Sequence, residues 1–210
     1  MRKSKFTLVE LLMVIGIIAI LAGILLPVVN GAAKKADMTK AKAEITTLVN
    51  AIKQFEATYG HLPLPAGYAE GTIIGADKTC TNYPELIKVL QGETPNTTPY
   101  PTNPNTRNTR FLDIVGNVAG EFTDPWGEPY KIIFDADYDG KITSGTGILP
   151  IGYDASSNKT YLLIDGTHPL FFSVVIWSEG ANTNPKGAQD NVYSFPVAWD
   201  KGKKQYNITK

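Results

Sequence analysis

Three aspartates occupy alternate positions in residues 135–140, which read Asp-Ala-Asp-Tyr-Asp-Gly. Alternate carboxylates followed by a turn-forming glycine enclose Ca²⁺ in loops of the EF-hand type. The twelfth position of such a loop is Thr146 here rather than a bidentate glutamate, and no flanking helices are visible. Asp135, Asp137 and Asp139 are therefore calcium candidates. The alternative is a polar β-turn in which the aspartate side chains hydrogen-bond the backbone.

A single acid, Glu10, stands at the start of a long apolar segment. Residues from Leu11 to Val29 carry no charge, and residues 6–9 extend the uncharged stretch before Glu10. At about 1.5 Å rise per residue, such a helix can cross a hydrocarbon core of about 30 Å. A carboxylate at the centre of such a helix costs roughly 2.5–3.5 kcal/mol, and less near the interface. Its presence suggests a partner that neutralises it.

Residues that could carry catalysis are sparse. His61 and His168 have no cysteine or acid at the spacing of zinc ligands, and the sequence has no Gly-x-Ser-x-Gly or phosphate-binding glycine loop. Cys80 is the single cysteine, so no intrachain disulfide can form. A formal net charge of zero gives no reason to expect nucleic-acid binding. We therefore expect neither an enzyme nor a nucleic-acid-binding protein.

The apolar segment continues into an amphipathic one. Residues 32–59 contain no proline or glycine, and apolar residues recur among them at spacings of three and four. Gly60 can end the helix, and Pro63 and Pro65 bar its continuation. We expect one helix of about fifty residues, whose second half buries one face against a globular domain. The apolar positions of that half are Met38, Ala41, Ile45, Leu48, Val49, Ile52, Phe55 and Tyr59.

Residues 82–92 predict a second, short helix. Asn82 is its expected N-cap, Glu85 stands at the capping-box position and Gly92 can end it. Its inward-facing residues should be Leu86, Val89 and Leu90. The following residues, 93–110, are rich in proline, threonine and asparagine and predict a long exposed loop.

The C-terminal part of the chain predicts β structure. Residues 130–134, 161–164 and 171–177 are short apolar or alternating runs bounded by turn residues. The elements together indicate an α+β fold. In this fold an antiparallel sheet of three to five strands lies across the amphipathic half of the long helix.

The N-terminal residues carry a resemblance to a known family. Phe6-Thr-Leu-Val-Glu10-Leu-Leu, after a basic leader and before Pro27, resembles the N-terminal motif of type IV pilins and type II secretion pseudopilins. The resemblance implies that a prepilin peptidase cuts between Lys5 and Phe6 and methylates the new N-terminus. Glu10 would then pair with the N-terminal amine of a neighbouring subunit in the fibre. The family usually has glycine before the cut, where this chain has Lys5.

Pro27 has two interpretations, which can hold together. A proline inside a helix removes a hydrogen bond and clashes with the preceding turn, so a kink is expected. In the family, the segment around this proline can also lose helicity when subunits pack into a fibre.

Two other interpretations of the N-terminal segment remain open. A cleaved signal peptide would have a small-residue cleavage site after its apolar stretch, which Gly31-Ala32-Ala33 could loosely supply. A plain signal anchor accounts for the basic leader and the apolar span under the positive-inside rule, but it does not account for Glu10.

Two later segments resemble the major pseudopilins. Residues 124–130, Asp-Pro-Trp-Gly-Glu-Pro-Tyr, resemble a stretch that precedes their sheet, and residues 176–182 with those near 190 resemble their C-terminal calcium-binding loop. The resemblance places Asn182 at the first ligand position and Asp190 or Asn191 at a later one. Asparagine in place of aspartate lowers the charge of the ligand set. Many adhesive pilins close a C-terminal loop with a cysteine pair, and its absence here favours the pseudopilin side of the family.

The resemblance implies four parts: a basic leader (1–5), a transmembrane and polymerisation helix (6–30), an amphipathic helix (31–60) and a globular periplasmic domain (61–210). The expected function is that of a structural subunit of a type II secretion pseudopilus, held in the bacterial inner membrane by a single span. Its expected partners are further copies of itself, the prepilin peptidase, other pilins or pseudopilins and the inner-membrane assembly platform. Calcium is the candidate cofactor.

Alternative functions remain open at this stage. A subunit of a type IV pilus for adhesion, motility or DNA uptake is the alternative within the family. A membrane-anchored binding module that never polymerises is the alternative outside it. A membrane-tethered enzyme would lack any visible catalytic constellation.

Overall fold

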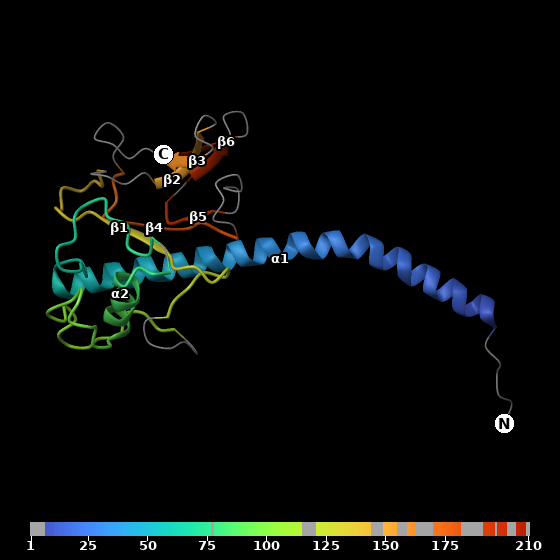
Figure 1. Ribbon diagram of the computed structural model, residues 1–210, viewed down its shortest axis with the longest axis horizontal. Helices are drawn as coiled ribbons and strands as arrows, with labels where there is room; N and C mark the ends of the chain where they lie inside the picture. Colours follow the sequence, from blue (N-terminus) through green and yellow to red (C-terminus); the bar gives the residue numbers. More distant parts are fainter. Residues whose placement is uncertain are drawn as a thin grey trace, which may run out of the picture.

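The computed structural model describes residues 7–76, 78–114, 121–143, 149–154, 159–162, 170–181, 191–195, 197–200 and 205–208. Its longest element is helix α1, Leu8–Tyr59, whose N-terminal half extends away from the rest of the molecule (Figure 1). The helix begins at a capping box with Thr7 as the N-cap. It ends at Gly60, whose φ of 75° favours a residue without a Cβ. The prediction of one long helix ending at Gly60 is confirmed.

The C-terminal half of α1 packs against the globular part of the chain. Its side chains at spacings of three and four form one buried face, which agrees with the predicted amphipathic pattern. The residues of this face that are at most 1% exposed are Ala41, Ile45, Leu48, Ala51, Ile52 and Phe55. On the polar side of the helix, Lys42 Nζ donates a hydrogen bond to the carbonyl oxygen of Tyr193.

A three-stranded antiparallel sheet lies across this half of the helix, in the order β1-β4-β5. Its strands are β1 (Lys131–Phe134), β4 (Val174–Ser178) and β5 (Val192–Tyr193). Ile132 of β1 stands opposite Ile176 of β4, and α1 packs against β4 and β5. The predicted α+β fold is confirmed.

Both faces of this sheet are buried. Alternate strand residues point to opposite faces, so each strand contributes to two cores. Ile132 and Ile176 join the core that contains the buried face of α1. Ile133, Val175 and Trp177 belong to a second core, together with Leu170, Tyr193 and Phe195. Burial on both sides accounts for the continuous apolar runs that mark these strands in the sequence.

Two further hairpins complete the described sheet structure. The first pairs β2 (Leu149–Asp154) with β3 (Lys159–Leu162), and the second pairs β6 (Val197–Asp200) with β7 (Gln205–Ile208). Strands β2 and β7 contact each other. In the view of Figure 1 the hairpins lie on the side of the β1-β4-β5 sheet away from α1.

Two predicted strands have different boundaries in the structure. The sequence pattern predicts a strand over 171–177, whereas β4 begins at Val174, and Phe171 before it is 73% exposed. Leu170 forms an isolated bridge with Ile142 instead, so the chain changes direction before β4 begins. The strand expected over 161–164 is β3, which ends at Leu162, and residues 163–164 lie outside the described ranges.

The second helix, α2 (Asn82–Gln91), is confirmed, but the predicted cap is wrong. Thr81 is the N-cap and makes no side-chain capping hydrogen bond. Glu85 does not fold back to the helix start either. Its carboxylate accepts hydrogen bonds from the backbone N–H (2.5 Å) and side-chain Nδ2 (2.7 Å) of Asn96. A buried carboxylate needs several donors, and the loop after α2 supplies them. The inward-facing residues were predicted correctly, since Leu86, Val89 and Leu90 are fully buried.

Candidate functional site

The N-terminal end of α1 presents Glu10 in a local hydrogen-bonded arrangement. The Glu10 carboxylate accepts hydrogen bonds from the backbone N–H (2.8 Å) and the hydroxyl (2.7 Å) of Thr7, and the Glu10 N–H donates to the Thr7 hydroxyl at 3.3 Å. This reciprocal pair is a capping box, which satisfies donors that a helix start leaves unpaired. Thr7 therefore supplies hydrogen bonds to the Glu10 carboxylate, whereas its negative charge still has no opposite charge among these contacts. The predicted processing residues Lys5 and Phe6 lie outside the described residues.

Beyond Glu10, α1 exposes apolar side chains on all sides. In the described part of the chain, no helix is both long enough and apolar enough to span a membrane. The side chains of residues 24–30 lie outside that description. The backbone of Pro27 is helical within α1, and the N-terminal half of α1 curves in Figure 1. The exposed large apolar residues are Leu8, Val9, Leu11, Leu12, Met13, Val14, Ile15, Ile17, Ile18, Ile20 and Leu21, each 47–76% exposed.

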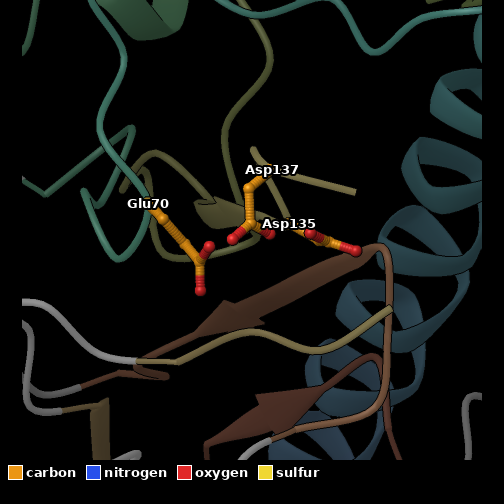
Figure 2. Close-up of side chains that lie close together, drawn as sticks. All are labelled: Glu70, Asp135 and Asp137. Carbon is orange, nitrogen blue, oxygen red and sulfur yellow. The ribbon is translucent and has the colours of Figure 1, made fainter. Parts of the chain in front are cut away.

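The second candidate site is a cluster of three carboxylates. Glu70, Asp135 and Asp137 each place one carboxylate oxygen within 4.8 Å of the other two, and Figure 2 shows the three side chains lying close together. Asp135 and Asp137 lie in the turn that follows β1, whereas Glu70 comes from the loop between α1 and α2. The structure therefore brings together two of the three predicted aspartates and adds an acid from elsewhere in the chain.

Asp135 is the buried member of this cluster, with only 3% of its surface exposed. Its Oδ2 accepts a hydrogen bond from the Gly140 N–H at 3.0 Å, while its Oδ1 is buried and has no hydrogen-bond partner among the described residues. Burial raises the pKa of the Asp135 carboxyl, an effect that the backbone N–H groups of Gly140 and Tyr138 oppose. The site therefore holds an acid with one unsatisfied oxygen.

Asp139, the third predicted aspartate, is not part of the cluster. Its carboxylate accepts the Lys141 N–H at 3.0 Å and pairs with Lys141 Nζ at 2.8 Å. Asp137 likewise accepts the Asp139 N–H at 3.2 Å. These hydrogen bonds to the backbone are the ones expected for the alternative interpretation of residues 135–140, a polar β-turn. They leave the buried Asp135 Oδ1 and the approach of Glu70 unexplained.

Glu70 is held in place by contacts that no sequence pattern indicated. Its Oε1 accepts hydrogen bonds from the Thr143 N–H (2.5 Å) and the Thr143 hydroxyl (2.8 Å). The loop that carries it is attached to β1 beside the site, because Tyr68 OH accepts the Phe134 N–H at 3.0 Å. Ile74 in the same loop forms an antiparallel bridge with Ile132. Glu70 could have been predicted to join this cluster only from contacts between residues far apart in the sequence.

The other predicted calcium residues, Asn182 and Asp190, lie outside the described residues. The segment that precedes them, residues 170–181, is described, and it contacts the segment that begins at Asp124. The Ser178 hydroxyl at the end of β4 donates a hydrogen bond to Asp124 Oδ2 at 2.5 Å. Asp124 Oδ1 accepts the N–H groups of Trp126 and Glu128. The two segments singled out in the sequence, 124–130 and 176–182, thus meet in the fold.

Comparison with known proteins gives relatives from one secretion system. The chain is 29% identical to the type II secretion system core protein G of Aeromonas hydrophila over 141 residues, which cover 67% of this chain and 79% of the relative. Its identity to the protein of the same name in Vibrio cholerae is 29% over 136 residues, or 65% and 74% of the two chains. The Escherichia coli protein of that name is 37% identical over 62 residues, which is 30% of this chain and 43% of the relative.

No protein-family model matches the sequence, and no solved structure matches it. The assignment therefore depends on the relatives, the N-terminal motif and the fold. A basic leader precedes the Phe-Thr-Leu-Val-Glu motif, and a long N-terminal helix lies on a small antiparallel sheet. Taken with relatives that all carry the same name, these features support the similarity to the pseudopilin family.

Proposed function

We propose that the chain is a structural subunit of a type II secretion pseudopilus, polymerised through the N-terminal half of α1. The observation that carries the proposal is the apolar surface of residues 8–21, against which the described residues of the globular part do not pack. The names of the relatives support a role in type II secretion. The proposed role is structural rather than catalytic.

The apolar half of α1 requires a cover. Burying one large aliphatic side chain is worth about 1.5–3 kcal/mol, so a helix that exposes many of them does not remain in water. Before assembly, the inner membrane would supply the cover, with the basic leader on the cytoplasmic side and the globular domain in the periplasm. After assembly, the same surface would pack against the helices of other copies at the centre of the fibre.

Cleavage by the prepilin peptidase between Lys5 and Phe6 would prepare the subunit for this packing. The new amine of Phe6 would carry a positive charge, and Glu10 of a neighbouring copy would neutralise it. A charge pair is strong in apolar surroundings because little water screens it. Thr7 holds the Glu10 carboxylate at the helix start, where the helix dipole favours a negative charge. The other proposed partners are further pseudopilins and the inner-membrane assembly platform.

Three variants of the full chain test this proposal by fibre yield in the native host. Glu10→Gln keeps a side chain that can close the capping box but removes the charge, so fibres should be lost although the helix forms. Glu10→Ala removes both and should also give no fibres. Asp113→Ala is the matched control, because Asp113 is an exposed acid whose ion pair among the described residues is with exposed Arg110, and it should assemble like the wild type. Wild-type fibre yield from Glu10→Gln would contradict the pairing.

Intact-mass analysis and N-terminal sequencing of the membrane-bound protein test the processing step. A chain that starts at N-methylated Phe6 supports the proposal. A chain that starts at Met1 or is cut after Ala33 contradicts it. A strain that lacks this protein tests the role in secretion. If that strain exports proteins normally while the wild type still forms fibres, the subunit would belong to a type IV pilus. Full function without any fibre would favour the anchored binding module.

A further inference from the structure

We propose that Glu70, Asp135 and Asp137 form a calcium site that ties the loop after α1 to the turn after β1. This site is separate from the polymerisation helix, and it differs from the predicted loop because Glu70 replaces Asp139 as a ligand.

The first observation is the unpaired oxygen. Asp135 is 3% exposed and its Oδ1 has no hydrogen-bond partner among the described residues. Buried polar atoms are almost always paired, because leaving a carboxylate oxygen without a partner costs free energy that folding must supply. The side chain belongs to a group of three carboxylates that lie close together (Figure 2), with one oxygen from each within 4.8 Å of the others. A cation bound among the three would give the buried Asp135 carboxylate a further partner.

The second observation is an excess of negative charge. Three carboxylates lie within 4.8 Å of one another, and like charges at such distances repel strongly when one of them is buried. Lys141 is close in the chain, but its ammonium group pairs with Asp139 at 2.8 Å. The charge of Lys141 also acts on Asp137 and Glu70, but one lysine faces four carboxylates here. The cluster keeps a net negative charge, which a divalent ion can neutralise.

The third observation is the chemistry and spacing of the ligand atoms. All three are carboxylate oxygens, and the cluster contains no histidine or cysteine, so it suits hard cations such as Ca²⁺ rather than Zn²⁺ or copper. Calcium–oxygen distances are about 2.3–2.6 Å, so two ligands of one ion can stand up to about twice that distance apart. Separations of up to 4.8 Å fit this range. Mg²⁺ needs oxygens at about 2.0–2.1 Å in near-octahedral geometry and gives up its waters reluctantly, so a cluster of protein carboxylates suits Ca²⁺ better.

The surroundings fit a metal that joins two segments. Asp137 is exposed and Glu70 is half-buried, so water can complete the coordination from the open side. Hydrogen bonds already orient two of the ligands: Thr143 holds Glu70, and the Gly140 N–H holds Asp135. Because Glu70 lies between the two helices and the aspartates follow β1, one ion would restrain both loops at once.

The test is calcium binding by the full-length chain in detergent micelles after removal of metal with a chelator. Isothermal titration calorimetry with calcium chloride should show binding, and magnesium chloride should bind more weakly. Glu70→Gln keeps an oxygen for Thr143 but removes the charge, so it should weaken calcium binding at this site at least about tenfold. Asp135→Asn should have a similar effect. Circular dichroism would show that both variants are folded.

Two matched variants make the test specific. Asp139→Asn lies in the same turn but outside the cluster, and it should leave the calcium affinity within about twofold of the wild type. Asp190→Asn removes a carboxylate from the other candidate loop and should leave this binding event in place. Loss of binding in Asp139→Asn with full binding in Glu70→Gln would overturn the proposal. Loss only in Asp190→Asn, or no binding at millimolar calcium, would overturn it as well.

Discussion

The two halves of α1 share one continuous backbone but differ in what covers them. In the C-terminal half, residues such as Ile45 and Phe55 are fully buried under the sheet and loops of the same chain. In the N-terminal half, residues such as Ile17 and Ile20 are more than half exposed. Apolar content alone does not tell where a helix is buried within its own chain. The amphipathic pattern marks the half covered by this chain, and the uniformly apolar pattern marks the half that needs a different cover.

The largest expected difference between the halves is in unfolding free energy. Phe55→Ala removes a ring that packs against Tyr59, His61 and Phe111, with centroids 4.7–5.7 Å away, so it should cost about 3–5 kcal/mol. Ile17→Ala, at a position 54% exposed, should change the unfolding free energy of the globular part by less than about 0.5 kcal/mol. Denaturant unfolding of the full chain in detergent, followed by tryptophan fluorescence, measures both. Equal losses would mean that the globular part also depends on the N-terminal half.

A second difference concerns calcium, if it binds at Glu70, Asp135 and Asp137. Calcium at one hundred times its dissociation constant should raise the unfolding free energy of the globular part by about 2.7 kcal/mol. Glu70→Gln should remove most of this gain at the same calcium concentration. Hydrogen exchange sharpens the comparison, because added calcium should slow exchange in residues 61–76 and 135–143 and leave residues 8–23 unchanged. Slower exchange along the whole of α1 would contradict a site confined to these two loops.

The elements that sequence analysis predicted are those with local signals. The end of α1 follows from Gly60 and the prolines after it, and the buried face follows from spacings of three and four. Strand β1 follows from a short apolar run between turn residues. In each case the information lies within a few positions of the feature it predicts.

The features that sequence analysis missed depend on contacts between distant residues. Glu70 reaches the aspartates only because its loop pairs with β1, and nothing near residue 70 indicates this. Asn105 lies in a segment predicted to be an exposed loop, yet it is fully buried. Its side chain bonds the carbonyl oxygens of Val89 and Thr109 and the hydroxyl of Tyr59. A polar residue can be buried wherever the fold supplies its partners, and that supply cannot be seen in a local pattern.

Glycine substitutions should have opposite effects in the two regions. Gly60→Ala places a side chain at a φ of 75° and should cost about 1 kcal/mol, although no atom crowds the added Cβ. Gly16→Ala lies inside the exposed half of α1, again with nothing within 4 Å, and should stabilise the helix by roughly 0.5–1 kcal/mol. Denaturant unfolding checks the first value. The second is checked by hydrogen exchange of residues 8–23, where slower exchange is expected and faster exchange would contradict the prediction.

The smallest expected effect lies where the two halves meet. Lys40 and Glu44 stand one helical turn apart, with 3.9 Å between Nζ and Oε1, and the Lys40 side chain is 63% exposed. Exposed pairs at this spacing are worth about 0.3–0.5 kcal/mol, so Lys40→Ala should be almost neutral.

Glu44 has a second role, because its Oε2 accepts a hydrogen bond from the hydroxyl of buried Tyr130 at 2.6 Å. Glu44→Ala should therefore cost about 1–3 kcal/mol, since it leaves that hydroxyl without its acceptor. If the two variants lost equal stability in denaturant unfolding, the ion pair rather than the bond to the sheet would hold this part of α1 in place.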